Sequence, residues 1–207
     1  ANADTTTVNE DDSVIVDVLT NDTDIDGGTP ALESFTQGTN GTVTDNGDGT
    51  LTYEPNGNFN GSDTFNYTIS DGQGGTATGT ATITITPIND DPTANNDTAN
   101  VNEDETVIVA ALTNDTDIDG DTLSIDSFTQ GTSGTVTNNG DGTLTYEPDA
   151  EFSGNDSFTY TVSDGNGGTA VATVNITIES VNDAPIANAD TTTVNEDDSV
   201  IVDVLTN

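Results

Sequence analysis

The sequence predicts an all-β protein made of tandem β-sandwich domains, and three observations support this prediction. Closely similar segments begin at Ala1, Ala94 and Ala187, so the chain repeats itself with a period of 93 residues. Within a repeat, apolar residues take every second place in short runs, and clusters of Gly, Asn and Asp separate these runs. No stretch shows the apolar period of a helix, so we expect almost no helix.

The first repeat contains seven such runs. Alternation is clear where Phe65, Tyr67 and Ile69 share one face of a run whose other face carries Thr, Asn and Ser. Frequent turns between antiparallel strands are typical of two packed sheets, so each repeat is expected to form a seven-stranded immunoglobulin-like sandwich. The strands are predicted near residues 4–9, 13–19, 31–36, 42–45, 50–54, 63–70 and 76–86.

The repeats also predict the domain boundaries. Residues 1–93 and 94–186 align without a gap and are identical at 61 positions, so each is predicted to be one domain. Residues 187–207 duplicate residues 1–21 without a change and would be strands A and B of a third repeat. Two strands alone are at best marginally stable. This segment is therefore expected either to open a further domain of a longer chain or to be completed by strands from a neighbouring chain.

An odd number of strands brings the chain into a domain at one pole and out at the other. Successive sandwiches are therefore predicted to stack end to end. The linkers at 87–92 and 181–185 contain proline and no Gly/Ser tether, so we expect them to be short and stiff.

The composition is strongly acidic, with 38 Asp and Glu and no Lys, Arg or His. Without basic residues the chain is not expected to bind nucleic acid, and no apolar run approaches the roughly 20 residues of a membrane span. Leu, Ile, Val and Phe make up about a fifth of the chain, which by itself would also suit an acidic disordered polypeptide. A net charge of −38 opposes compaction, so a cation from the solvent is expected.

Aspartates alternate in one loop of each repeat, in the pattern D-x-D-x-D-G. This spacing places three carboxylates on one side of a tight turn, and Ca²⁺ takes six to eight oxygen ligands. Glu33 and Asp126 follow at the distance of the last acid of an EF-hand loop, but the flanking elements are predicted strands, so an EF-hand is not expected. The candidate ligands in the two loops are Asp22, Asp24, Asp26, Asp115, Asp117 and Asp119.

Topology is expected to bring three acidic segments to one junction: residues 10–12, the linker residues Asn89, Asp90 and Asp91, and the loop at 115–119. Two carboxylates about 4 Å apart repel by roughly 4 kcal/mol at an effective dielectric near 20, so such a cluster either binds cations or prevents stacking. Solvated loops and a halophile-type acidic surface are the alternatives. Mg²⁺ prefers few carboxylates, and Zn²⁺ lacks its His and Cys ligands here.

Motifs recur in both repeats: V-N-E-D, L-x-N-D-x-D-x-D-G, N-G-D-G-T-L-T-Y-E-P and S-D-G-x-G-G-T. On these motifs the whole chain resembles the cadherin-like, immunoglobulin-like tandem repeats of large calcium-dependent bacterial surface adhesins. The resemblance implies sandwiches rigidified by calcium bound between repeats, as in eukaryotic cadherins. At the first junction it implies the ligands Glu10, Asp11, Asn89, Asp90, Asp115, Asp117 and Asp119. At the second junction it implies Glu103, Asp104, Asn182 and Asp183.

The predicted function is structural: a calcium-rigidified extender or fibre segment of an extracellular bacterial adhesin or filament. The expected partners are calcium ions, neighbouring repeats of the same chain and other copies of the chain in a filament. The alternative is an adhesive module that binds carbohydrate or protein, although the aromatic residues occupy matching positions in both repeats rather than one distinctive loop. No enzymatic activity is expected, because only carboxylate pairs could act.

Overall fold

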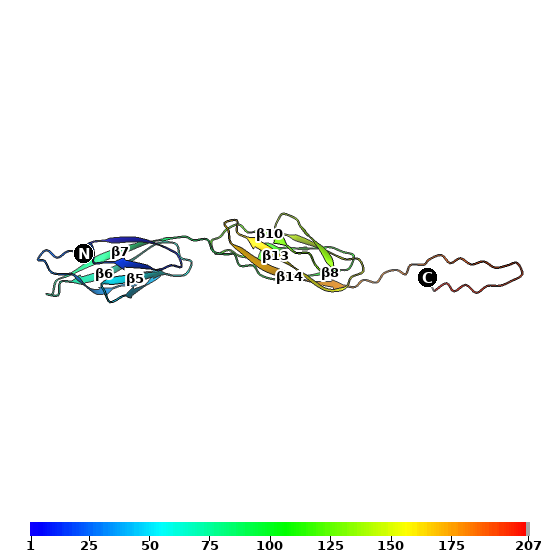
Figure 1. Cartoon of the computed structure of the whole chain (residues 1–207), viewed down its shortest axis with the longest axis horizontal. Coiled ribbons are helices and arrows are strands. Elements are labelled where there is room, and N and C mark those ends of the chain that lie inside the picture. Colours follow the sequence, from blue (N-terminus) through cyan, green and yellow to red (C-terminus); the bar gives the residue numbers. More distant parts are fainter. Residues whose placement is uncertain (206–207) are drawn as a thin grey trace. The chain divides into compact units, whose positions relative to one another are not determined.

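The computed structural model describes residues 1–205 (Figure 1). Contacts along the chain divide it into two compact units. The first unit contains residues 1–93 together with two loops, 116–123 and 163–170. The second contains residues 94–115 and 124–162 and the described part of 171–207. These two loops, which are grouped with the first unit by their contacts, carry many of the acidic residues described below.

Seven strands build the sandwich of the first unit. One sheet has the order β1 (Asp4–Asn9), β7 (Thr76–Thr86), β6 (Gly61–Ser70) and β3 (Ala31–Phe35). The other has the order β2 (Val14–Asp17), β5 (Thr50–Pro55) and β4 (Gly41–Asp45). The predicted all-β, immunoglobulin-like class is confirmed.

One part of the strand prediction is wrong. The strands were expected to be antiparallel throughout, but β1 pairs with β7 in parallel, from Asp4 beside Ala81 to Asn9 beside Thr86. The reason is topological. In a sandwich of seven alternating strands the first and last run in the same direction, so they can neighbour each other only as a parallel pair.

The core lies between the two sheets of this sandwich. The apolar positions of the alternating runs point inward, and Leu51, Tyr53, Phe65, Tyr67 and Ile83 are at most 2% exposed. The rings of Tyr53 on β5 and Phe65 on β6 stack with centroids 6.3 Å apart, so they connect the two sheets. Burying each of these side chains contributes on the order of 1.5–3 kcal/mol. The outward positions carry Thr, as the alternation predicted.

A buried carboxylate joins the two sheets as well. Asp63 on β6 accepts hydrogen bonds from the Tyr53 hydroxyl at 2.8 Å and from three backbone N–H groups, those of Thr39, Asn40 and Thr64. Burial disfavours the charge of Asp63, but these four hydrogen bonds outweigh it and lower the pKa of the carboxyl group. In the second repeat Asp156 and Tyr146 form the same contact at 2.7 Å. These aspartates therefore have a structural role.

The second repeat forms an equivalent sandwich. Its strands are β8 (Asp97–Asn102), β9 (Val107–Val109), β10 (Ser124–Phe128), β11 (Gly134–Asn138), β12 (Leu144–Pro148), β13 (Gly154–Ser163) and β14 (Thr169–Glu179). A short 3₁₀ helix, η1 (Ala111–Asn114), follows β9, and no α-helix occurs among residues 1–205. The two sheets have the orders β10-β13-β14-β8 and β11-β12-β9.

Residues 187–205 form no helix or strand. Val194 and Val202, which correspond to the buried Val8 and Val16 of the first repeat, are about half exposed at 53% and 43%. That this segment opens a third repeat stays a prediction. The described part of the chain contains no helix long and apolar enough to cross a membrane.

Candidate metal centre

Three carboxylates of the first unit meet at one place. One oxygen each from Glu10, Asp90 and Asp119 lies within 4.8 Å of the other two. Glu10 follows the end of β1, Asp90 follows β7, and Asp119 belongs to the loop 116–123. The Asp119 carboxylate also accepts a hydrogen bond from the backbone N–H of Asp90 at 2.8 Å. The group therefore joins residues that are far apart in the sequence and includes no basic side chain.

Glu10 holds the segment after β7 in place. Its side chain is only 2% exposed, and one of its oxygens accepts the backbone N–H of Ile88 at 2.7 Å. Its own N–H donates to the carbonyl of Thr86 at 2.9 Å. Asp11, the next residue, has a positive φ of 64° and accepts the N–H of Asn58 at 3.1 Å. The tight turn at residues 9–12 thus places two adjacent acids against two different segments.

The loop 116–123 contributes a second group of acids. Oxygens of Asp117, Asp119 and Asp121 lie within 4.8 Å of one another, so Asp119 belongs to both groups. Asp117 Oδ1 accepts the N–H groups of Asp119 and Asp121 at 2.9 and 3.2 Å, which fixes the shape of the loop. Asp117 Oδ2 is buried and has no hydrogen-bond partner. A buried carboxylate oxygen of this kind is costly unless a cation or a proton satisfies it.

The other two linker residues contact the loop 163–170. The Asn89 side chain donates to Asp164 at 2.7 Å, and Asp91 accepts the N–H of Thr169 at 3.2 Å. Asp164 also accepts the N–H groups of residues 166–168. The hydrogen bond from Asn89, followed by those from the backbone, lowers the pKa of Asp164, so this carboxylate is firmly ionised.

The second unit has a corresponding group. Asp104, Glu151 and Asp183 offer oxygens within 4.8 Å of one another, and all three are exposed. Buried Glu103 accepts the N–H of Val181 at 2.7 Å, as Glu10 accepts that of Ile88. The side chain of Asn182 donates to the carbonyl of Asp183.

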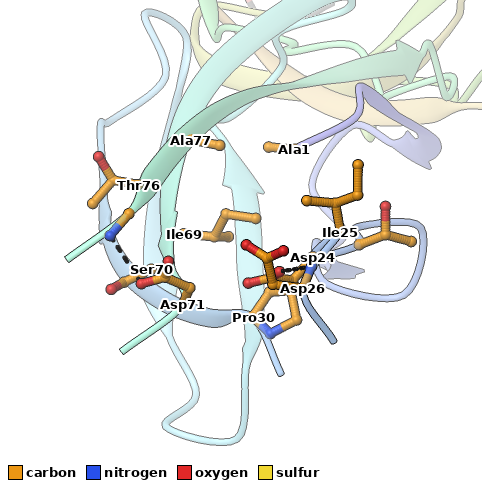
Figure 2. Close-up of a pocket in the computed structure, with 12 residues that line it drawn as sticks. Ala1, Asp24, Ile25, Asp26, Pro30, Ile69, Ser70, Asp71, Thr76 and Ala77 are labelled. Carbon is orange, nitrogen blue, oxygen red and sulfur yellow. Dashed lines mark hydrogen bonds between the residues drawn. The ribbon is translucent and has the colours of Figure 1, made fainter. Parts of the chain in front are cut away.

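In the first repeat, the loop equivalent to 117–121 borders an open hollow. This cavity has a volume of about 270 Å³. Figure 2 shows Asp24, Asp26 and Asp71 around it, with Ala1 nearby. These aspartates occupy the positions of Asp117, Asp119 and Asp164. Asp24 accepts the N–H of Asp26 at 2.7 Å, so this loop has the same internal turn.

The first aspartate of each D-x-D-x-D-G loop, also a predicted ligand, lies away from these groups. Asp22 and Asp115 are each 8% exposed and belong to none of the three acidic groups. Asp115 accepts the N–H of Asn95 at 2.7 Å and the hydroxyl of Tyr160 at 3.1 Å. Asp22 accepts the N–H of Asn2 at 2.5 Å. The first aspartate of each D-x-D-x-D-G loop therefore faces the interior of its own sandwich. It lies before the turn, whereas the other two aspartates lie within the turn.

The electrostatics of the acidic groups reflect their mutual repulsion. Partial desolvation, and then the charges of Asp11, Asp119 and Glu10, raise the pKa of Asp90. The charges of Asp183 and Asp104 raise the pKa of Glu151. Like charges brought together in this way disfavour ionisation, and a bound cation would reverse the effect.

Three residues of these contacts were not predicted from the sequence. Asp121 was missed because the first repeat has Gly28 at the same position, so comparison of the repeats gave no signal. Glu151 replaces Asn58 of the first repeat, and this change from an amide to a carboxylate was an available signal. Asp164 lies in the recurring S-D-G-x-G-G-T motif, which gave no sign of a ligand, and its hydrogen bonds from residues 166–168 identify the motif as a turn.

The donor set fits Ca²⁺. It consists only of oxygens, it includes carboxylates from separate segments, and it contains one buried carboxylate oxygen without a partner. Ca²⁺ takes six to eight such ligands in flexible geometry, whereas Mg²⁺ requires a near-ideal octahedron and retains water. Zn²⁺ would require His or Cys, which the chain lacks.

Comparisons with known proteins place this arrangement in context. The curated protein GAMETE EXPRESSED 2 of Arabidopsis thaliana is 45% identical over 85 residues, which is 41% of this chain. The chain spans only 9% of the length of that relative.

Two solved structures align with the chain at low sequence identity and with TM-scores below 0.5. The extracellular cadherin domains 1–5 of protocadherin gamma B2 align with 95% of this chain and 43% of theirs, at 16% identity and a TM-score of 0.49. The endo-fucoidan hydrolase MfFcnA4 of glycoside hydrolase family 107 aligns with 87% of this chain and 28% of its own, at 21% identity and a TM-score of 0.37.

The bacterial Ig domain family matches twice, over residues 1–84 and 89–177. The two matches follow the two sandwiches and together cover more than half of the chain. The predicted resemblance to bacterial immunoglobulin-like tandem repeats is thereby confirmed, and the chain belongs to the bacterial Ig domain family.

Proposed function

We propose that this chain is a calcium-rigidified extender segment of an extracellular bacterial surface protein. The observation that carries the proposal is the convergence of Glu10, Asp90 and Asp119 next to the unpartnered oxygen of Asp117, in a chain without a single basic residue. No side chain of the protein can neutralise these carboxylates, so the positive charge has to come from the solvent. Membership of a bacterial Ig domain family supports the structural role and the surface location.

Calcium would supply positive charge that offsets the repulsion among these carboxylates and binds them as common ligands. The residues that would hold it are Glu10, Asp90, Asp117, Asp119 and Asp121. The remaining contacts belong to the protein itself. Glu10 fixes Ile88 by accepting its N–H, and Asn89 and Asp91 anchor the same segment to the loop 163–170. The metal and these hydrogen bonds would together keep residues 87–93 from moving freely.

A second calcium site would form from Asp104, Glu151 and Asp183 in the second unit. Residues 187–207, which we propose open a third repeat, follow this group in the chain. The partners of the chain are then its own neighbouring repeats and calcium ions, and other copies of the chain where segments assemble into a filament.

Calcium titration of matched variants tests the proposal. Asp117→Asn combined with Asp119→Asn should lower calcium affinity, measured calorimetrically, and should increase the flexibility of residues 87–93, measured by NMR relaxation. Each sandwich should stay folded, because neither side chain is in a core. The control Glu33→Gln with Glu54→Gln removes the same charge from exposed strand positions. Equal calcium binding by both variants and the parent would refute the proposal.

A further inference from the structure

Each repeat contains a second pair of aspartates that belongs to none of the acidic groups described above. In the second repeat the pair is Asp97 and Asp115, and both lie beside the hydroxyl of Tyr160. In the first repeat the equivalent residues are Asp4, Asp22 and Tyr67. Asp4 and Asp97 begin β1 and β8, and the other aspartate of each pair begins the D-x-D-x-D-G loop. The same constellation is therefore built twice.

In the second repeat, four oxygens surround one hydroxyl group. The Tyr160 oxygen lies 2.9 Å from the carbonyl of Ala111, 3.2 Å from the carbonyl of Asn95, and 3.0 and 3.1 Å from the carboxylates of Asp97 and Asp115. A hydroxyl carries one proton, so it can fully satisfy only one of these acceptors. Four acceptors therefore share a single hydroxyl donor in a buried or partly buried environment.

In the first repeat, two buried carboxylate oxygens have no hydrogen-bond donor. Tyr67 donates its proton to the carbonyl of Asn2 at 2.6 Å. Asp4 Oδ2 and Asp22 Oδ2 are both buried and have no hydrogen-bond partner. Asp22 is more than nine-tenths buried, with 8% of its side chain exposed. Burial, and after it the Asp22 charge, raise the pKa of Asp4, and the nearby Tyr67 hydroxyl partly offsets them.

The chain has no internal means of neutralising these pairs. It contains no Lys, Arg or His, and the N–H donors nearby already bind the other carboxylate oxygens: Asn21 binds Asp4 Oδ1 and Asn2 binds Asp22 Oδ1. Two buried carboxylates at one hydroxyl repel each other strongly in a low-dielectric interior. A cation from the solvent, or a proton shared between the two carboxylates, would relieve this repulsion.

We propose that each repeat binds a calcium ion inside its own sandwich, at the carboxylate pair beside Tyr67 or Tyr160. Two carboxylates, the carbonyls of Asn95 and Ala111 and the phenol oxygen supply hard oxygen ligands in the second repeat, and water completes the shell. Asn2 and Asn95 belong to the segments that lead into β1 and β8. The ion would therefore attach the entrance of each repeat to its body. This site is independent of the acidic groups of the proposed function, because it shares no residue with them.

The test removes one carboxylate from each pair, in Asp4→Asn with Asp97→Asn, and counts the bound calcium in the whole chain by equilibrium dialysis. The proposal predicts two ions fewer than in the parent. It also predicts a loss of terbium luminescence excited through tyrosine, because Tb³⁺ in this site would touch Tyr67 or Tyr160, and the chain has no Trp. Far-UV circular dichroism checks that the variant is folded.

The matched comparison is Asp117→Asn with Asp119→Asn, which should keep the two internal ions even if the proposed function fails. An unchanged ion count and unchanged terbium luminescence in Asp4→Asn with Asp97→Asn would overturn the inference. An unchanged ion count in this variant, together with a higher melting temperature than that of the parent in chelator, would also overturn it. That result would show that the aspartates of the parent share a proton and do not bind calcium.

Discussion

Asp63 provides the prediction that the structure defines most closely. Its side chain is 5% exposed and accepts four hydrogen bonds: Thr39 and Thr64 donate to Oδ1, and Asn40 and Tyr53 donate to Oδ2. Asp63→Asn retains one oxygen and replaces the other with an amide group, which is itself a donor. Two of the four donors then lose their acceptor.

Each hydrogen bond to a charged group contributes about 1.5–3 kcal/mol, so the loss of two should destabilise the first repeat by about 3–6 kcal/mol. Domain stability is about 0.05–0.15 kcal/mol per residue, or roughly 5–14 kcal/mol for a repeat of 93 residues. At about 4–8 °C per kcal/mol for a domain of this size, the melting temperature of this repeat should fall by more than about 12 °C.

Differential scanning calorimetry at fixed calcium concentration measures the effect. Asp63→Asn should lower the transition of one repeat, Asp156→Asn the transition of the other, and the double variant both, because the two residues make equivalent contacts. Asp48→Asn, in an exposed turn, is the control for loss of charge. A melting temperature within about 4 °C of the parent for Asp63→Asn would show that its four hydrogen bonds do not stabilise the sandwich as reasoned.

Three further predictions follow from the same structure. Burial favours protonation of Asp63 and Asp156, but hydrogen bonds lower the pKa of both below 3.8. Their contribution to the stability of the sandwich is therefore present above that pH and is lost as the pH falls through the folded-state pKa. Measuring the melting temperature during an acid titration would detect this loss. The pKa values of Asp4, Asp97, Asp90 and Glu151 are raised, so in chelator their charges destabilise the fold at neutral pH and this destabilisation should be relieved as the pH falls through the raised values; a melting temperature that stays equally below that of a variant with Asn or Gln at the four positions would contradict this. Gly41→Ala would place a Cβ 2.4 Å from the Tyr53 ring, and this overpacking should lower the free energy of unfolding in denaturant by about 1–3 kcal/mol. In the control Gly47→Ala the new Cβ meets no neighbouring atom, so this variant should show only the strain of a positive φ.

The sequence predicted most of the strand positions because local patterns define them. Alternation located β6 and β7, and glycine-rich turns located their ends within about two residues. The strand predicted at 13–19 ends at Asp17, because this side chain accepts the N–H of Leu19 and the hydroxyl of Thr20 and so starts a turn. Alternation alone could not predict the parallel pairing of β1 with β7, because pairing depends on which sheet each strand joins.

The candidate site was predictable in part for similar reasons. Repetition identified the loop of Asp117 and Asp119 and the acids at Glu10 and Asp90, which the structure brings together. Spacing could not separate Asp115 from Asp117 and Asp119, because the direction of each side chain depends on where the turn begins. It also could not relate Glu151 to Asp104 and Asp183, since this contact joins loops distant in the sequence.

The most direct test of the proposed function is thermal unfolding of the whole chain with saturating calcium and with excess chelator. An ion present at 100 times its dissociation constant adds about 2.7 kcal/mol. At about 4–8 °C per kcal/mol, the loss of one ion from a repeat should lower its melting temperature by roughly 11–22 °C. The proposal predicts a fall of at least this size on chelation and its recovery when calcium is restored. Superimposable unfolding curves in calcium and in chelator would contradict it.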